Sequence, residues 1–284
     1  MVLVGLASTA IGQTPGSKQY STDLAQWRKA QEHDLTRDEG WLSVAGLFWL
    51  KEGDCTIGSS EACAVRLPES APAEVGTLTR EGNHVTLTTK VGVVATLKGQ
   101  KVISQELALD SDRVSIGSLT FMAIHRGSRI GVRLFDKSCK GYKEFKGQNW
   151  YAANPKFVLQ AKFVPYEPPK SVNITNVIGD TQPVAVVGYV EFTLDGKVCR
   201  LDAQGQGGGL FINFRDNTSG KTTYPAGRFL DAPAPVNGMV TIDFNRATNP
   251  PCAWTSFATC PLPPRQNFLG VAVPAGEKTH HPVE

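Results

Sequence analysis

The sequence predicts a mainly β protein with two β domains, and three observations support this fold class. From residue 42 onward, short apolar segments with alternating polarity follow one another, separated by turns of Gly, Asn, Asp and Ser. The dipeptide Asp195-Gly196 lies between two such segments and is the strongest hairpin signal in the chain. A helical apolar stripe occurs only near the N-terminus, from Ser21 to about Arg37.

The N-terminal half is expected to begin with this helix and to continue as strands. Ser21 or Thr22 supplies a side-chain oxygen that can cap the helix. Strands are then expected at residues 42–50, 76–80, 84–88, 114–116, 119–124 and 130–135, with Glu-Gly-Asn as the hairpin turn after residue 80. Strands this short and this closely spaced are typical of a β-sandwich.

A proline-rich stretch at residues 163–170 (FVPYEPPK) predicts a stiff connector and the boundary between the domains. Strands of the second domain are expected at residues 190–194, 198–201, 210–214, 222–230 and 239–244. The predicted organisation is a signal-like segment and linker (1–19), a helix plus sandwich (20–162), the connector (163–170), and an antiparallel β domain with a Cys/Pro-rich loop (171–284).

Composition excludes several classes of partner. The 284 residues carry a net charge of +3, and Lys and Arg are scattered among acidic residues without forming a basic block. We therefore expect no nucleic-acid partner. No run of eighteen apolar residues occurs, so no membrane-spanning helix is expected.

The N-terminus resembles the second half of an export signal. Val2–Ile11 is apolar, and Ala10 and Gly12 are small residues ahead of a possible cut before Gln13, although no basic residue precedes Lys18. The six cysteines form an even set, which is consistent with an oxidising compartment. The expected location is periplasmic or secreted, and it is cytoplasmic if this stretch is not a signal.

Several motifs together resemble a known family. They are GWLSVAGLFWL at 40–50, DNTSG at 216–220, GRFL at 227–230, the Cys/Pro-rich stretch DFNRATNPPCAWTSFATCPLPP at 243–264, and AGEK at 275–278. They resemble the bacterial family catalogued as domain of unknown function 1684, over roughly residues 20–278. The family carries no established activity. The resemblance implies an N-terminal helix plus a forkhead-associated (FHA)-like β-sandwich, followed by a C-terminal antiparallel β domain.

Phosphothreonine reading is not expected of this FHA-like part. It would need an Arg directly after the Ile-Gly turn and a Ser-x-x-His loop, because a phosphate requires charged and hydroxyl donors. Here Gly58 is followed by Ser59 and Ser60, and the loop at 69–74 lacks the His. The domain is therefore interpreted as a scaffold, or as a degenerate FHA-like module for non-catalytic protein interaction.

The cysteines allow several interpretations. Cys55 with Cys63 and Cys252 with Cys260 share one spacing, and both pairs are disulfide candidates. Two buried thiols are the alternative for Cys252 and Cys260. Cys252 is also a weak candidate for a catalytic nucleophile, which would need a lowered pKa. The five His form no spaced ligand motif, so no metal is expected.

No cofactor is expected either. The Gly-rich run at 205–209 and the Ser-Gly-Lys-Thr sequence at 219–222 do not form a phosphate loop, because Arg215 stands where the first Gly is needed.

Polar residues of the second domain predict a site for a small polar or anionic ligand, such as a sugar or an organic acid. The candidates are Arg215, Tyr224, Arg228, Asp243, Asn245, Arg246 and Asn249. Arginine forks can clamp a carboxylate or a phosphate, and Asp243 is a weak candidate for an acid or base in hydrolysis. An internal Arg-Asp network is the alternative. A Cys252-dependent enzyme is the remaining functional alternative.

Overall fold

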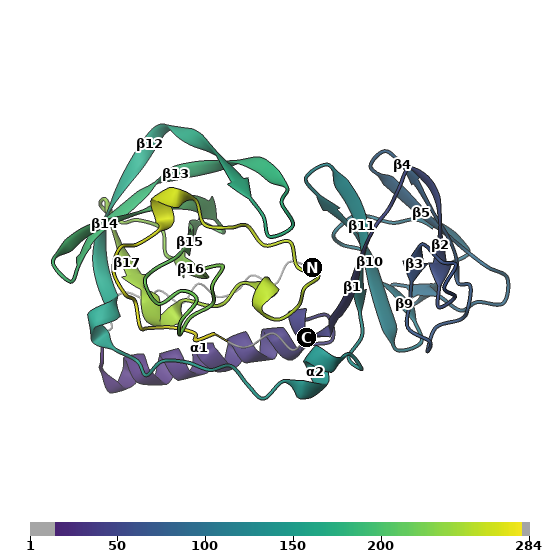
Figure 1. The fold of residues 1–284 in the computed structure, drawn as a ribbon, viewed down its shortest axis with the longest axis horizontal. Coiled ribbons are helices and arrows are strands. Elements are labelled where there is room, and N and C mark those ends of the chain that lie inside the picture. The colour runs from purple at the N-terminus through teal and green to yellow at the C-terminus, as the bar shows by residue number, and fades with distance from the viewer. Residues whose placement is uncertain (1–14, 280–284) are drawn as a thin grey trace.

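The computed structural model describes residues 15–279. Over this range the chain has one long helix and two groups of mostly antiparallel strands, which form two β units side by side (Figure 1). The predicted mainly β fold class is therefore confirmed. The signal-like segment at residues 2–11 lies outside the described residues. None of the helices within residues 15–279 is long and apolar enough to cross a membrane.

The helix α1 (Lys18–Thr36) begins earlier than predicted and is capped by Ser17, not by Ser21 or Thr22. The Ser17 Oγ accepts a hydrogen bond from the Tyr20 N–H at 3.1 Å, which satisfies an amide of the first turn. Figure 1 shows α1 running along the second β unit. The helix therefore packs against the C-terminal strands, although the strands that follow it in sequence belong to the first unit.

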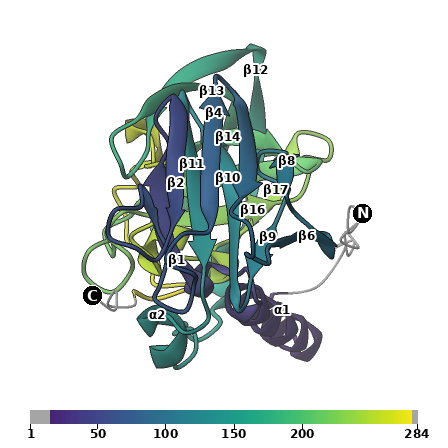
Figure 2. The same cartoon turned by 90° about the vertical axis from the view of Figure 1, so that its right-hand side faces the viewer.

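The first β unit has two sheets with a common core. Their strand orders are β3-β2-β4-β5-β8 and β1-β11-β10-β9-β6-β7. The strands are β1 (Val44–Trp49), β2 (Gly53–Gly58), β3 (Val65–Arg66), β4 (Gly76–Glu81), β5 (His84–Thr89), β6 (Thr96–Leu97), β7 (Gln100–Lys101), β8 (Ser104–Glu106), β9 (Val114–Ile116), β10 (Leu119–Arg126) and β11 (Arg129–Phe135). Alternate side chains of both sheets, such as Leu78 and Phe121, are buried between them. Figure 2 shows this unit in front of the second one.

The second β unit is one six-stranded sheet in the order β16-β15-β14-β13-β12-β17. Its strands are β12 (Val158–Thr175), β13 (Thr181–Leu194), β14 (Lys197–Gln206), β15 (Gly209–Phe214), β16 (Arg228–Ala232) and β17 (Met239–Asp243). Phe229 of β16 pairs with Thr248, just beyond β17, so the two edges of the sheet approach each other around a separate core.

Short helices occupy the connections. They are η1 (Trp41–Ser43), α2 (Lys140–Glu144), η2 (Pro155–Phe157), η3 (Phe244–Arg246), η4 (Pro251–Ala253) and η5 (Arg265–Asn267).

The two hairpins with the clearest turn signals are confirmed. Asp195 and Gly196 join β13 to β14 with φ values of 51° and 74°, the left-handed conformation that a two-residue turn requires. Gly82 and Asn83 join β4 to β5, and Gly82 has a φ of 59°. The predicted strand at 222–230 is wrong in its first part, since β16 begins only at Arg228.

Residues 163–170, predicted to be a connector, are part of β12. The ladder with β13 continues on both sides of them, with a register shift between Pro165 and Lys170. Proline lacks an N–H to donate, so the strand bulges locally and the pairing then resumes. The segment that joins the two β units is residues 136–157, between β11 and β12.

The Cys/Pro-rich stretch 243–264 reaches across to the first β unit. The Thr255 hydroxyl donates to the Val44 carbonyl at 3.2 Å. Phe257 packs against a small apolar cluster of the first unit that includes Val44 and Ile124. The stretch therefore lies between the two β units and contacts both of them.

The tip of the β12–β13 hairpin reaches the same junction. Arg129 of β11 pairs with Asp180 at 2.8 Å. The Val177 N–H donates to the Cys260 carbonyl at 2.9 Å. Three segments distant in sequence therefore meet where the two units adjoin.

We expect Leu78→Ala to lower the free energy of unfolding by about 2–5 kcal/mol, because Leu78 is fully buried between the two sheets of the first unit. Urea denaturation followed by circular dichroism measures the change. Val91→Ala is the control, since Val91 is fully exposed, and its unfolding midpoint should match that of the wild type. Equal shifts for the two variants would contradict the assigned core.

Candidate functional site

A buried ion pair between Arg228 and Asp216 cross-links the second β unit. Arg228 is 0% exposed, and its Nη2 donates to Asp216 Oδ2 at 2.8 Å and to the Val273 carbonyl at 3.0 Å. Its Nη1 donates to the Ala275 carbonyl. Burial lowers the pKa of Arg228, and the Asp216 carboxylate opposes that shift. The guanidinium is enclosed by protein groups and does not face an open hollow.

A second network surrounds Asp243. The Tyr20 hydroxyl donates to Asp243 Oδ2 at 2.9 Å, and Arg246 Nε donates to the same oxygen at 3.2 Å. Asn245 Nδ2 donates to the Tyr20 hydroxyl oxygen and to the Asn154 carbonyl, both at 3.0 Å. Burial, and then the charge of Asp243, raise the pKa of Tyr20. Asp243 and Asn245 therefore anchor α1 to the second unit.

The remaining ligand candidates lie in separate environments. The Tyr224 hydroxyl donates to the Cys252 carbonyl at 2.8 Å. The Asn249 side chain donates to the Lys278 carbonyl at 2.7 Å. Arg215 lies over the ring of Phe268, 5.1 Å from its centroid.

The structure does not bring Tyr224, Arg228, Asp243 and Asn245 around one hollow. Each side chain forms hydrogen bonds with other segments of the chain. This is the arrangement expected for an internal polar network, the alternative to a ligand site. Sequence spacing could not decide between the two arrangements, because the partners at residues 20, 273 and 275 come from distant segments.

All six cysteines are free thiols in this structure. Cys55 and Cys63 donate to different carbonyls, those of Lys51 and Ala73, at 3.8 and 3.6 Å, and no bond joins these two disulfide candidates in this structure. Cys252 and Cys260 are neighbours without a bond between their sulfurs, which matches the alternative of two thiols.

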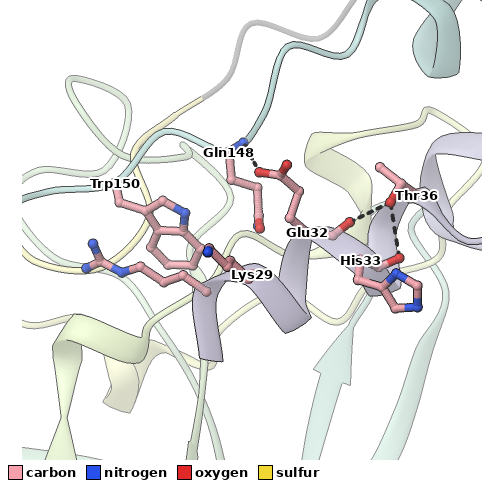
Figure 3. A pocket seen from close by; sticks show the side chains of 7 residues that line it. Lys29, Glu32, His33, Thr36, Gln148 and Trp150 are labelled. Atoms are coloured by element: carbon pink, nitrogen blue, oxygen red, sulfur yellow. Dashed lines mark hydrogen bonds between the residues drawn. The ribbon is translucent and has the colours of Figure 1, made fainter. Parts of the chain in front are cut away.

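An open groove lies between α1 and the extended segment at residues 148–150 (Figure 3). It holds about 390 Å³, and its lining residues are Arg28, Lys29, Glu32, His33, Thr36, Gln148 and Trp150. The backbone N–H of Gln148 donates to Glu32 Oε2 at 3.3 Å, which joins the two walls. The Thr36 hydroxyl turns back to the Glu32 carbonyl at 2.9 Å.

Arg28 is the most buried of the charged side chains that line this groove. Its guanidinium lies over the Trp150 ring, 4.7 Å from the centroid, and its Nη2 donates to the Asn245 carbonyl at 3.4 Å. Its Nε is buried without a hydrogen-bond partner. Burial lowers the pKa of Arg28, and Tyr20 and Asp243 oppose that shift. No carboxylate within residues 15–279 forms an ion pair with it.

The sequence analysis missed this groove. Arg28, Glu32 and Thr36 are four residues apart, so they share one face of α1, and this polar face was the available signal. Gln148 and Trp150, which form the opposite wall, come from beyond the first unit, and their approach depends on the tertiary fold. Among the residues that the structure describes, no three His, Cys, Asp or Glu side chains gather as metal ligands.

The half of the chain that contains these networks matches a known family. Residues 143–278 match the family described as protein of unknown function (DUF1684). A solution NMR structure of an uncharacterized protein from gene locus rrnAC0354 of Haloarcula marismortui is 33% identical, covering 48% of this chain and 78% of that chain, with a TM-score of 0.41. The chain belongs to the DUF1684 family.

The DUF1684 chain is also similar to solved FHA domains. The FHA domain of FhaA, solved with the intracellular domain of Rv3910, is 18% identical and covers 31% of this chain and 96% of that chain, with a TM-score of 0.24. The Rv0020c FHA structure is 21% identical over 32% of this chain and 95% of that chain, with a TM-score of 0.23. Comparison with curated proteins yields no match.

We expect Asp216→Ala to destabilise the DUF1684 chain by about 3–5 kcal/mol, because it leaves the Arg228 guanidinium buried without its counter-charge. The double variant Arg228→Met with Asp216→Leu removes both charges and should recover much of that loss. Urea denaturation measures both effects.

Glu61→Ala is the control for this pair. It breaks the exposed Arg66–Glu61 ion pair and should change stability by no more than about 1 kcal/mol. Similar costs for Asp216→Ala and Glu61→Ala would show that the Arg228–Asp216 pair does not stabilise the fold.

Alkaline unfolding tests the Tyr20 network. The pKa of Tyr20 is raised in the folded chain, so its neutral hydroxyl stabilises the fold below the ordinary tyrosine pKa of about 10, and this contribution is lost as pH rises above that value. The Tm of the wild type should therefore fall more steeply than that of Tyr20→Phe between about pH 9 and pH 11. Parallel curves in a calorimetric pH series would contradict the assignment.

Proposed function

We propose that this DUF1684 protein binds a small polar or anionic molecule, such as an organic acid or an acidic sugar, in the groove between α1 and residues 148–150. The observation that carries the proposal is the state of Arg28. Its guanidinium is partly buried, keeps one long hydrogen bond and has no carboxylate partner within the described residues. Within the chain, Asp243 opposes the effect of burial on Arg28 by its charge alone, without an ion pair, and an anionic ligand would supply a bonded partner.

The rest of the groove supports this chemistry. Lys29 and His33 line the α1 wall of the groove together with Arg28. Glu32 lies on the same wall and is the acidic residue of the lining. Trp150 presents an aromatic surface against which a carbon skeleton can pack. The groove volume of about 390 Å³ falls within the usual range for small-molecule sites.

The proposed activity is binding, without hydrolysis at Asp243. The Asp243 oxygens accept hydrogen bonds from Tyr20 and Arg246, and Asp243 does not line the groove. A general acid or base must reach the substrate proton directly or through one water. Asp243 lacks that access.

Isothermal titration with citrate, glucuronate, inorganic phosphate and neutral glucose tests the proposal. We expect at least one of the three anions to bind and glucose to bind more weakly than glucuronate, because the missing partner is a negative charge. Affinity for the bound anion should fall as salt rises from about 50 to 500 mM.

Arg28→Met keeps an apolar stem beside Trp150 and removes the charge. It should weaken anion binding about tenfold or more, the usual effect of losing a charge-assisted hydrogen bond. Lys18→Met is the matched control, because Lys18 is an exposed cation of α1 outside the groove. The proposal fails if no anion binds, or if both variants lower the affinity equally.

A further inference from the structure

Cys252 and Cys260 lie at the junction of the two β units, and other segments of the chain hold them in place. Cys252, in η4, is partly exposed, whereas Cys260 is buried. The Cys252 carbonyl accepts a hydrogen bond from the Tyr224 hydroxyl at 2.8 Å. The Cys260 carbonyl accepts one from the Val177 N–H at 2.9 Å. The fold therefore positions both sulfurs without a bond between them.

The two thiols are direct neighbours with unequal acidity. The Cys252 N–H donates to Cys260 Sγ at 3.2 Å. A hydrogen bond from the Cys260 thiol lowers the pKa of Cys252, burial opposes this, and the Tyr224 hydroxyl lowers it further. The same thiol contact, together with burial, raises the pKa of Cys260. The accessible sulfur therefore ionises more readily, and the buried sulfur keeps its proton.

Arg133 of β11 brings a positive charge to this pair from the first unit. Its side chain is 4% exposed, its Nε and Nη2 have no hydrogen-bond partner, and it lies over the Trp41 ring, 4.7 Å from the centroid. Burial lowers the pKa of Arg133 to about 10, Arg126 adds to that shift, and Asp110 and Cys260 oppose it. A buried guanidinium without a bonded anion is costly, so negative charge on the thiol pair is favoured here.

We propose that Cys252 and Cys260 form a reactive dithiol that exchanges with low-molecular-weight disulfides such as oxidised glutathione, with Arg133 stabilising the Cys260 thiolate of the second step across the junction. The exposure of the two cysteines assigns their roles in the exchange. Cys252 is the attacking thiol, and Cys260 resolves the mixed disulfide. This site is separate from the groove at α1, and neither proposal depends on the other.

The exchange balances in two steps. The Cys252 thiolate attacks one sulfur of the glutathione disulfide, forms a mixed disulfide and expels a glutathione thiolate, which takes up the proton that Cys252 had released. The Cys260 sulfur then attacks the Cys252 sulfur, and the second glutathione leaves with the Cys260 proton. The protein dithiol is oxidised by two electrons, and one glutathione disulfide is reduced to two thiols.

The test uses the full chain, reduced and then freed of reductant. After incubation with oxidised glutathione and alkylation of the remaining thiols, trypsin cuts after Arg246 and Arg265, so both cysteines fall in one peptide, 247–265. We expect this peptide to lose two hydrogens and to escape alkylation. Cys139 is the internal control, because it is also partly exposed but hydrogen-bonds to the Leu42 carbonyl. It should stay reduced.

Variants separate the roles. Cys260→Ser should trap glutathione on Cys252, and Cys252→Ser should trap none at residue 260. In the chain that keeps both cysteines, Arg133→Met should slow release of the second glutathione from the Cys252 mixed disulfide at least about threefold, because the Cys260 thiolate loses a nearby cation. Arg66→Met is the control from the first unit, since Arg66 is an exposed residue of β3 that pairs with Glu61. It should leave the rate unchanged, and circular dichroism checks that each variant is folded.

Three results would overturn the proposal. One is a static Cys252–Cys260 disulfide, which is present on purification and is reduced only after denaturation. Another is equal or faster reaction at Cys139. The third is a folded Arg133→Met variant that reacts as fast as its parent.

Discussion

The second β unit depends on one buried ion pair, Arg228 with Asp216. Burying a guanidinium costs several kcal/mol unless charge and hydrogen bonds are matched, and here a carboxylate and two carbonyls match it. Because the carbonyls belong to the C-terminal segment, the pair fixes the position of that segment. Glu277 follows in the same segment, and its carboxylate accepts from the Asn249 N–H at 2.7 Å. The Cys/Pro-rich stretch is thereby held near its start.

Two other arginines show what happens when that matching is incomplete. Arg28 and Arg133 are both stacked on tryptophan rings, and neither forms an ion pair with a carboxylate of the described residues, whereas Arg228, whose Nε is also buried without a partner, pairs with Asp216. An aromatic face compensates a cation only in part, by about 0.5 to 2 kcal/mol. The remaining electrostatic cost favours negative charge close by. A ligand carboxylate can supply this negative charge at Arg28, and a thiolate can supply it at Arg133. Anion binding and thiol exchange are therefore proposed near these two arginines and not near Arg228.

Local signals predicted the fold well, and non-local contacts limited the prediction of the site. The Asp195-Gly196 turn needs only its own two residues to adopt positive φ, so its hairpin could be predicted from sequence. The proline-rich stretch was misplaced, because a bulge lets β12 absorb prolines when β13 pairs on both sides of them. Arg228 and Asp243 were correctly singled out as unusual, but their partners come from the C-terminal segment and from α1. No spacing rule gives that information, so cross-linking could not be distinguished from ligand binding.

The position of the thiol pair connects its reactivity with the arrangement of the two units. Cys252, Cys260 and Tyr224 all belong to the second unit, whereas Arg133 belongs to β11 of the first. The contacts that keep Arg133 beside Cys260 are few: Thr255 on Val44, Phe257 on its apolar cluster, and Arg129 on Asp180. Separation of the units would leave the hydrogen bond from the Cys252 N–H to Cys260 Sγ intact and would remove the cation. In the proposed exchange the first unit then acts as more than a scaffold, because its docking brings a cation to Cys260, the resolving thiol.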